Sequence, residues 1–358
     1  MAADDPSDLT PILTLSDFEA PAQAALAPGV HGYVAGGAWD ELTLGENVAA
    51  WRRRVLRPRV LVDVASVRTA TTLLGAPAAM PVAIAPVADH GAIHPDGELA
   101  TVRAAAAAGI PFILSTFATR SIEEVAAAAP GATRWFQLYV QTDRRRTEQL
   151  VRRAVAAGYG AIVVTVDVPL VGYRERDRRS GYDVPDLSRS ALDLADEHGV
   201  VPVLSVPPPP SLTWADLATI RALAPDLPLV LKGIMTAEDA RLAVEHGVDA
   251  IVVSNHGGRQ LDRVAGSADL LEEVAGAVGG GPELWVDGGV RRGLDVVTAL
   301  ALGARGVLIG RPALWALAVA GQAGVERALE ILREELHVAL ALLGAPGPDA
   351  VTRAHVGR

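Results

Sequence analysis

The stretch with the most evident chemistry runs from Ser254 to Asp262 and directly follows an apolar run at 250–253. It places His256 and Arg259 three residues apart, and the two glycines between them allow a ligand to approach the backbone. An imidazole can take up a proton near neutral pH, and a guanidinium can hold an anion through paired hydrogen bonds. A lone histidine in a glycine turn is more often bonded to backbone. The density of polar residues here instead favours a base beside an anion site.

Other polar side chains also follow apolar runs. Lys232 ends the run at 228–231 and needs an electron-rich partner, because a buried, unpaired ammonium is costly. Its position fits an electrostatic role and a Schiff-base role equally well. Asp167 ends another run, where it could orient a protonated His256 or cap its own loop. The remaining candidates of this kind are Gln137, Tyr139 and Thr165.

Glycine and arginine recur together late in the sequence, in Asp287-Gly-Gly-Val-Arg291 and in Gly310-Arg311. Glycines expose backbone amides and arginines add bidentate contacts, so both segments suit a phosphate group. We therefore predict a cofactor that carries phosphate. No metal-ligand spacing, Walker A motif or Rossmann glycine pattern occurs, so neither a metal nor a nicotinamide cofactor is predicted.

The elements that must position these residues alternate from about residue 81 onward, as short apolar runs followed by longer alanine-rich segments. This alternation is typical of βα units in a parallel sheet. Closure would remove the unpaired edges of so wide a sheet, which favours a TIM (β/α)8 barrel with its active site at the C-terminal ends of the strands. The eight predicted strands are 81–87, 111–115, 135–140, 161–167, 228–233, 250–255, 283–287 and 306–310.

Two regions depart from a plain barrel. Residues 1–80 are predicted to form an N-terminal helical extension, with helices at 15–26 and 41–51, that covers the N-terminal mouth or one edge of the active face. Residues 168–212 form a long loop after strand four, and long loops of this kind are usually functional. Residues 81–358 complete the barrel and end in helices at 313–320 and 325–343, so that the whole chain forms one domain.

Composition narrows the possible functions. The 358 residues include no cysteine, which excludes disulfides, a thiolate nucleophile and iron–sulfur clusters. The net charge of −10 disfavours general binding to nucleic acid. No apolar run approaches the ~20 residues of a membrane helix, and the acidic N-terminus lacks the features of a secretory signal. A cytoplasmic protein without a membrane partner is expected.

These residues together resemble one family, the FMN-dependent 2-hydroxy acid oxidases and dehydrogenases, which includes glycolate, lactate and mandelate oxidases. The resemblance spans nearly the whole chain, and its most specific element is Ser254-Asn-His-Gly-Gly-Arg-Gln-Leu-Asp262. Supporting matches are Gly37-Ala-Trp-Asp-Glu-Leu-Thr-Leu44, Ala85-Pro86, His94-Pro-Asp-Gly-Glu98, Phe136-Gln-Leu-Tyr139, Thr165-Val-Asp167, Leu231-Lys-Gly233, Asp287-Gly-Gly-Val-Arg291 and Ile309-Gly-Arg-Pro312.

The resemblance implies a role for each matching residue. His256 is then the base, Asp167 pairs with its imidazolium, and Tyr139 assists catalysis. Arg174 and Arg259 clamp the substrate carboxylate, while Tyr33, Tyr139 and His256 also contact the substrate. The positions implied for FMN are Ala85, Pro86, Val87, Ser115, Gln137, Tyr139, Thr165, Lys232, Ser254, Asp287, Gly288, Gly289, Arg291, Gly310 and Arg311.

The implied reaction is the oxidation of a small (S)-2-hydroxy acid to the 2-oxo acid by a homo-oligomer, a tetramer or octamer. His256 could take the hydroxyl proton while a hydride leaves, or take the α-proton to form a carbanion. Two departures leave the substrate open: Phe117 stands where many relatives have tryptophan, and Val34 stands where a second tyrosine often follows Tyr33.

The electron acceptor is predicted from the charged loop after strand four. Its arginines 174, 176, 178 and 179 and its acids Asp183, Asp186, Asp193, Asp196 and Glu197 make it a poor membrane insert. Dioxygen, giving hydrogen peroxide, is therefore favoured over membrane quinone. The alternatives are a soluble dehydrogenase with another acceptor, a flavin-binding protein without turnover, and an FMN barrel of the isopentenyl-diphosphate isomerase type.

Overall fold

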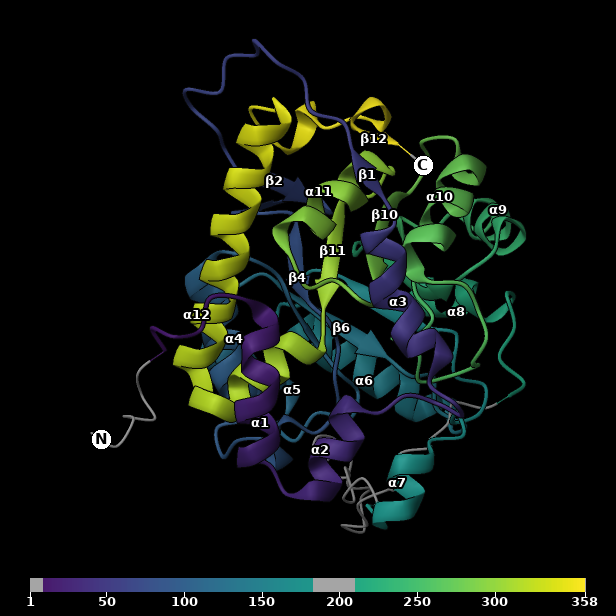
Figure 1. Cartoon of the computed structure of the whole chain (residues 1–358). Coiled ribbons are helices and arrows are strands. Elements are labelled where there is room, and N and C mark those ends of the chain that lie inside the picture. The colour runs from purple at the N-terminus through teal and green to yellow at the C-terminus, as the bar shows by residue number, and fades with distance from the viewer. Residues whose placement is uncertain (1–8, 183–209, 358) are drawn as a thin grey trace, which may run out of the picture.

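Eight parallel strands close into a barrel in this computed structural model, which describes residues 9–182 and 210–357 (Figure 1). In barrel order from the first, the strands are β4 (Val82–Ile84), β5 (Phe112–Leu114), β6 (Arg134–Leu138), β7 (Ile162–Thr165), β8 (Leu229–Ile234), β9 (Ala250–Val253), β10 (Glu283–Asp287) and β11 (Gly306–Ile309). Each coincides with one of the eight predicted strands. The predicted TIM barrel is therefore confirmed.

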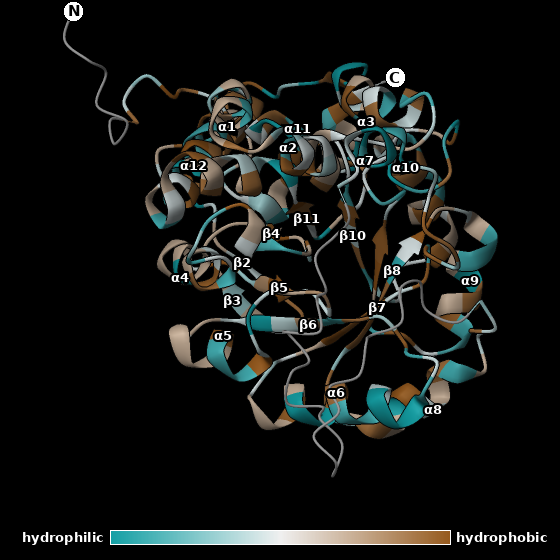
Figure 2. Cartoon of the chain, turned by 90° about the horizontal axis from the view of Figure 1, so that it is seen from below, coloured by the Kyte–Doolittle hydropathy of each residue, from teal (hydrophilic) through white to brown (hydrophobic). Residues whose placement is uncertain are grey.

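The strands read as continuous apolar runs because both of their faces are buried. One face fills the barrel interior, where the rings of Trp135 and Trp285 meet edge to face with centroids 5.2 Å apart. The other face packs against the surrounding helices in a second, larger apolar layer. In Figure 2, β7 and β10 are in hydrophobic colours, whereas α6 and α8 carry long hydrophilic stretches.

One of eight barrel helices follows each strand, as the alternation predicts, and the loop after β7 contains a further short helix. The predicted capping box at the start of α5 forms, because Ser121 accepts a hydrogen bond from the Glu124 N–H and Glu124 accepts one from the Ser121 N–H. The eight helices are α4 (Glu98–Ala108), α5 (Ile122–Ala128), α6 (Arg144–Ala156), α8 (Asp216–Leu223), α9 (Ala237–Glu245), α10 (Ser267–Val278), α11 (Gly293–Ala301) and α12 (Arg311–Leu343). The two predicted C-terminal helices are the halves of α12, which kinks at Ala320 and Gly321.

The N-terminal extension is more varied than the predicted pair of helices. The predicted helices appear as α1 (Glu19–Ala25), preceded by a 3-10 turn, and as α3 (Leu42–Arg52). Between them lies α2 (Pro28–Ala35), which the sequence analysis did not predict. Residues of this extension also form three short strands: β2 (Thr71–Leu73) and β3 (Ala76–Ala78) pair in an antiparallel hairpin, and β1 (Val55–Leu56) pairs with β12 (Val356–Gly357) at the C-terminus. The two predicted helices therefore form, and the short strands that accompany them were not predicted.

The two parts of the extension cover opposite ends of the barrel. The hairpin closes the N-terminal mouth, where Leu73 and Ala78 join the apolar cluster of the interior. In contrast, α2 lies at the C-terminal mouth and packs against α7 (Glu175–Ser180), a short helix within the loop after strand four. Part of that loop, residues 183–209, lies outside the described residues, and this part includes Asp183 and Pro207.

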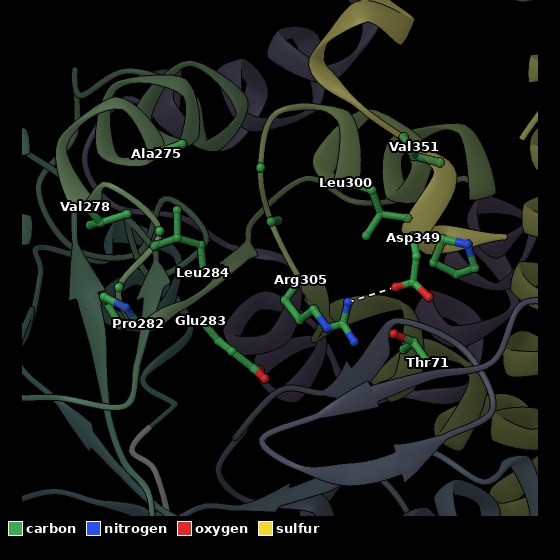
Figure 3. A pocket seen from close by; sticks show the side chains of 15 residues that line it. Thr71, Ala275, Val278, Pro282, Glu283, Leu284, Leu300, Arg305, Asp349 and Val351 are labelled. Carbon is green, nitrogen blue, oxygen red and sulfur yellow. Dashed lines mark hydrogen bonds and ion pairs between the residues drawn. The ribbon is translucent and has the colours of Figure 1, made fainter.

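A groove of about 680 Å³ opens beside the hairpin, at the start of β10 and β11 (Figure 3). Arg305 crosses it and donates hydrogen bonds to Asp349 at 3.0 Å and to the Thr72 hydroxyl at 2.8 Å. This is the N-terminal end of the strands, which in barrels supports stability and not chemistry. We therefore assign these contacts to holding the hairpin in place.

Among the described helices, none is both long and apolar enough to cross a membrane.

Candidate active site

Polar side chains from adjacent strands meet inside the C-terminal mouth. The Lys232 ammonium at the end of β8 lies 3.0 Å from Asp287 Oδ2 and donates to Ser254 Oγ at 2.9 Å. Ser254 in turn donates to Asp287 Oδ1 at 2.7 Å. The two aspartates Asp287 and Asp167 outweigh burial and raise the pKa of Lys232 above its usual value. Lys232 therefore remains a fixed positive charge, which disfavours the Schiff-base role.

His256 and Asp167 form a buried pair beside this cluster. His256 Nδ1 lies 2.9 Å from Asp167 Oδ1, and the side chain of Asp167 is only 1% exposed. Burial lowers the pKa of His256 and outweighs the charge of Asp167, which raises it. Burial alone would raise the pKa of Asp167, but His256 and Lys232 hold it below its usual range. The pair therefore combines a neutral imidazole with a charged carboxylate, as a general base requires.

The backbone at His256 adopts a conformation that few side chains tolerate. Its φ is 59°, and Gly257 and Gly258 follow with φ of 65° and 77°. A non-glycine residue in this region costs of order 1 kcal/mol and persists only when its surroundings enforce it. The enforcing contacts include Ser254 Oγ, which accepts the His256 N–H at 3.1 Å. This strain marks the loop as a built site.

The loop is also clamped by a distant helix. Asn47 on α3 and Asn255 exchange hydrogen bonds between their amides at 2.9 and 2.7 Å, and both side chains are buried. Asp262 caps the start of α3 by accepting the Thr43 N–H at 2.8 Å. Sequence reasoning assigned no role to Asn47, Asn255 or Asp262. The available signal was Asn47 itself, an amide directly before the apolar run at 48–51 of a predicted helix.

Two arginines and two tyrosines gather next to His256, as the resemblance implied. Arg259 donates to the carbonyls of Tyr33 and Gly36 at 2.5 and 2.8 Å, and its guanidinium lies 4.8 Å from the centre of the Tyr33 ring. Arg174 donates to the Arg259 carbonyl at 3.3 Å. Burial and the charge of Arg174 lower the pKa of Arg259 to about 10. Burial and Asp167 raise the pKa of Tyr139, which keeps its hydroxyl protonated as a donor.

The residues predicted to hold a phosphate follow the last two barrel strands, β10 and β11. Arg311, at the start of α12, donates to the carbonyls of Val34, Gly36 and Gly257 at 2.8–3.0 Å. Arg291 donates to the Val290 carbonyl and lies over the Trp315 ring. Burial lowers the pKa of both guanidiniums. Within the described residues, neither guanidinium has a carboxylate within 4 Å. Two half-buried guanidiniums that contact no carboxylate in the part of the chain that the structure describes fit an anionic group such as a phosphate.

Gly288 and Gly289 have a second reason to be glycine. A Cβ at Gly288 would lie 2.5 Å from Ser267 Oγ, and one at Gly289 would lie 2.1 Å from the Asn47 carbonyl oxygen. Both residues also have positive φ, at 93° and 80°. Close packing against α3 and α10 therefore explains these glycines without a ligand, and their role toward phosphate stays a prediction. A Cβ at Gly310 would make only ordinary contacts.

The residues predicted to surround the flavin ring line the ends of β4 to β7. Gln137 links its neighbours, since its amide donates to the Thr165 hydroxyl at 3.0 Å and accepts the Thr116 N–H at the same distance. Ser115, Gln137 and Thr165 are all buried. Ala85, Pro86 and Val87 directly follow β4, at the same end of the barrel. The chain thus supplies neutral donors and acceptors at the ends of β5 to β7, and two arginines after β10 and β11 that contact no carboxylate among the described residues, which fits the ring and the phosphate of FMN.

Fold and site together define a flavin-binding barrel oxidoreductase, and comparison with known proteins identifies its family. The family of FMN-dependent dehydrogenases matches residues 22–358. The chain is 48% identical to an L-lactate oxidase of Nostoc sp., covering 93% of this chain and 94% of the relative. It is 45% identical to 2-hydroxyacid oxidase 2 of Homo sapiens, covering 96% and 97%. The chain belongs to the FMN-dependent dehydrogenase family.

Solved structures agree with this assignment. The chain superposes on a crystal structure of mandelate oxidase with (S)-2-phenylpropionate at a TM-score of 0.88 and 44% identity, covering 96% of this chain and 98% of the other. A glycolate oxidase of Oryza sativa subsp. japonica is 46% identical over 354 residues. The predicted FMN cofactor and oxidoreductase class are thereby confirmed. The roles of single residues stay predictions.

Proposed function

We propose that the enzyme oxidises a small (S)-2-hydroxy acid to the corresponding 2-oxo acid. The observation that carries this proposal is the juxtaposition of a neutral His256, paired with Asp167, and two arginines, Arg174 and Arg259, without a carboxylate partner in the described residues. A base beside two guanidiniums that have no carboxylate partner among the described residues suits a substrate that carries both a proton to be removed and a carboxylate. The oxidases among its relatives act on substrates of this class by their names.

Each residue then has a definite task. Arg174 and Arg259 bind the substrate carboxylate, and Tyr33 and Tyr139 donate hydrogen bonds that orient the substrate. His256 Nε2 takes the substrate proton, and the charge of Asp167 stabilises the imidazolium that forms. When bound, FMN would supply the two-electron redox chemistry that links the substrate to an external acceptor. Lys232 would lie beside the ring as a fixed positive charge, and Arg291 and Arg311 would hold the phosphate.

The proposal also covers the electron acceptor, the oligomeric state and the cellular location of the enzyme. We infer that dioxygen takes the electrons and yields hydrogen peroxide, in line with the oxidase names of the relatives. The acidic residues of the loop that motivated this inference lie outside the described residues. The family resemblance supports a homo-oligomer, either a tetramer or an octamer, and we propose a cytoplasmic location.

Anaerobic mixing with glycolate, lactate and mandelate should bleach the flavin absorbance near ~450 nm for at least one of the three acids. Air-saturated buffer should then restore the colour within seconds and give one hydrogen peroxide per flavin. Reoxidation over many minutes without peroxide would show a dehydrogenase that uses another acceptor. A protein that dithionite bleaches but that no 2-hydroxy acid bleaches would be a flavin-binding protein without turnover.

The pH dependence should follow the lowered pKa of His256. The base is active only when neutral, so kcat/KM falls as the pH drops through this pKa, and the acid limb should lie below pH 6.5. In Asp167→Asn the limb should move to lower pH, because the carboxylate charge that raises the His256 pKa is gone. The plateau should fall as well, since the imidazolium loses its partner. A limb that moves upward in this variant would contradict the assignment.

A further inference from the structure

Two aromatic rings at the mouth have no part in the proposed machinery. Tyr182, which follows α7, packs its ring against Tyr33 with centroids 5.3 Å apart. Phe117, on the loop after β5, packs its ring against Tyr139 with centroids 5.2 Å apart. Each of these rings therefore supports one of the two tyrosines that we assign to substrate binding.

Asp89 is hydrogen-bonded to both supports. The Tyr182 hydroxyl donates to Asp89 Oδ2 at 2.7 Å, and the Asp89 N–H donates to the Phe117 carbonyl at 3.2 Å. Asp89 is only 2% exposed and has a φ of 63°. Among non-glycine residues, aspartate and asparagine tolerate this backbone best. A buried carboxylate in a strained conformation thus joins the two aromatic supports.

The loop that carries Asp89 is itself held firmly. Glu98, which is fully buried at the start of α4, accepts hydrogen bonds from the His90 N–H at 3.3 Å and the Thr119 N–H at 2.9 Å. It therefore ties the residue after Asp89 to the loop after β5. Burial and the charge of Glu98 raise the pKa of Asp89, while the bond from Tyr182 opposes that rise. Asp89 is thus a fixed point, and the Tyr182 hydroxyl is attached to it.

The backbone of α2 is shaped to receive Tyr182. A Cβ on Gly29 would lie 3.2 Å from Tyr182 Cβ, so only a glycine leaves ordinary space there. Tyr33, one turn further along α2, contacts both the Tyr182 ring and the Arg259 guanidinium. A shift of Tyr182 would therefore be passed to Tyr33 and to its contact with Arg259.

We propose that Tyr182 and Asp89 are positioning residues that hold Tyr33 in place for substrate binding. The inference rests on the proposed function, because Tyr33 matters only if a substrate binds beside Arg259. The Tyr182–Asp89 hydrogen bond acts before any substrate arrives, so its loss should weaken ground-state and transition-state binding alike. Such a loss raises KM and leaves kcat nearly unchanged.

The test compares Tyr182→Phe with Tyr159→Phe. Tyr159 is a matched control, because its buried hydroxyl also donates a single hydrogen bond, to the Ile122 carbonyl at 3.0 Å, away from the mouth. Both variants should lose a similar amount of thermal stability, but only Tyr182→Phe should raise KM, by about tenfold, with kcat within about twofold of wild type. An unchanged KM in Tyr182→Phe, or an equal rise in both variants, would overturn the proposal.

Asp89 supplies the second test. Asp89→Asn keeps an acceptor oxygen and the tolerance for positive φ, so its KM should stay within about threefold of wild type. Asp89→Ala should raise KM as Tyr182→Phe does, and the double variant should be no worse than either single variant, because both remove one shared bond. Additive effects would contradict this coupling. If no 2-hydroxy acid bleaches the wild-type flavin, the proposed function fails and this inference with it; normal wild-type turnover with unchanged KM in Tyr182→Phe refutes only the inference.

Discussion

Replacing His256 with glutamine is expected to lower kcat/KM by about 10² to 10⁴-fold, the usual cost of removing a general base. Glutamine keeps a polar side chain of similar size but cannot take up the proton that the His256–Asp167 pair is arranged to accept. The loss should appear directly in the rate at which a 2-hydroxy acid bleaches the flavin under anaerobic conditions. FMN content and thermal unfolding should remain close to wild type, because Arg291 and Arg311 are untouched.

The matched control for this prediction is His246→Gln. His246 ends α9 and stacks on the Trp214 ring, outside the site, with centroids 5.4 Å apart. Its replacement should leave flavin reduction unchanged. Near-normal bleaching by the His256 variant would place the base elsewhere.

Arg259→Met should lower kcat/KM by about 10² to 10³-fold, because a charge-assisted contact to the substrate carboxylate is lost. Unlike the His256 variant, it should also raise KM strongly. The guanidinium holds the Tyr33 and Gly36 carbonyls as well, so α2 loses a contact at the same time. Substrates that lack the carboxylate separate the two effects: with the 2-hydroxy amide, the difference between variant and wild type should shrink.

The control for Arg259 lies on the same loop. Arg263 is 77% exposed and lies 3.5 Å from Asp40, so Arg263→Met removes a positive charge at the surface only. Its kcat/KM should remain within about twofold of wild type, since exposed ion pairs contribute little. Equal losses in Arg259→Met and Arg263→Met would indicate a general effect of charge and contradict the clamp.

The barrel and the strand-end residues were predictable because their signals are local. A buried parallel strand reads as a continuous apolar run, and a polar residue at its end must lie at the mouth. Lys232 and Asp167 were found in this way, and the structure places Asp167 against His256 and Lys232 against Asp287. The glycines at 288 and 289 were interpreted less completely, because their contacts with α3 come from residues more than 200 positions away.

The parts that were missed depend on distant partners. The turn at Leu74 and Gly75 connects β2 and β3, which close the N-terminal mouth of the barrel. No local sequence pattern reveals this role. Asp89 and Tyr182 are unremarkable residues until the fold brings them together across 93 positions. For the same reason Gln260 went without a role, although its amide donates to the Asp167 carbonyl at 3.0 Å and fixes the loop that carries that carboxylate.

The paired amides of Asn47 and Asn255 limit how this chain can be recombined with its relatives. A chimera that joins the first 60 residues of one family member to the barrel of another would pair one of these asparagines with a residue from the other parent. This new pair would lie directly beside His256. The same crossover would separate Thr43 from Asp262, which caps α3. The N-terminal segment and the loop after β9 therefore depend on each other. Chimeras that take both segments from the same parent should preserve activity best.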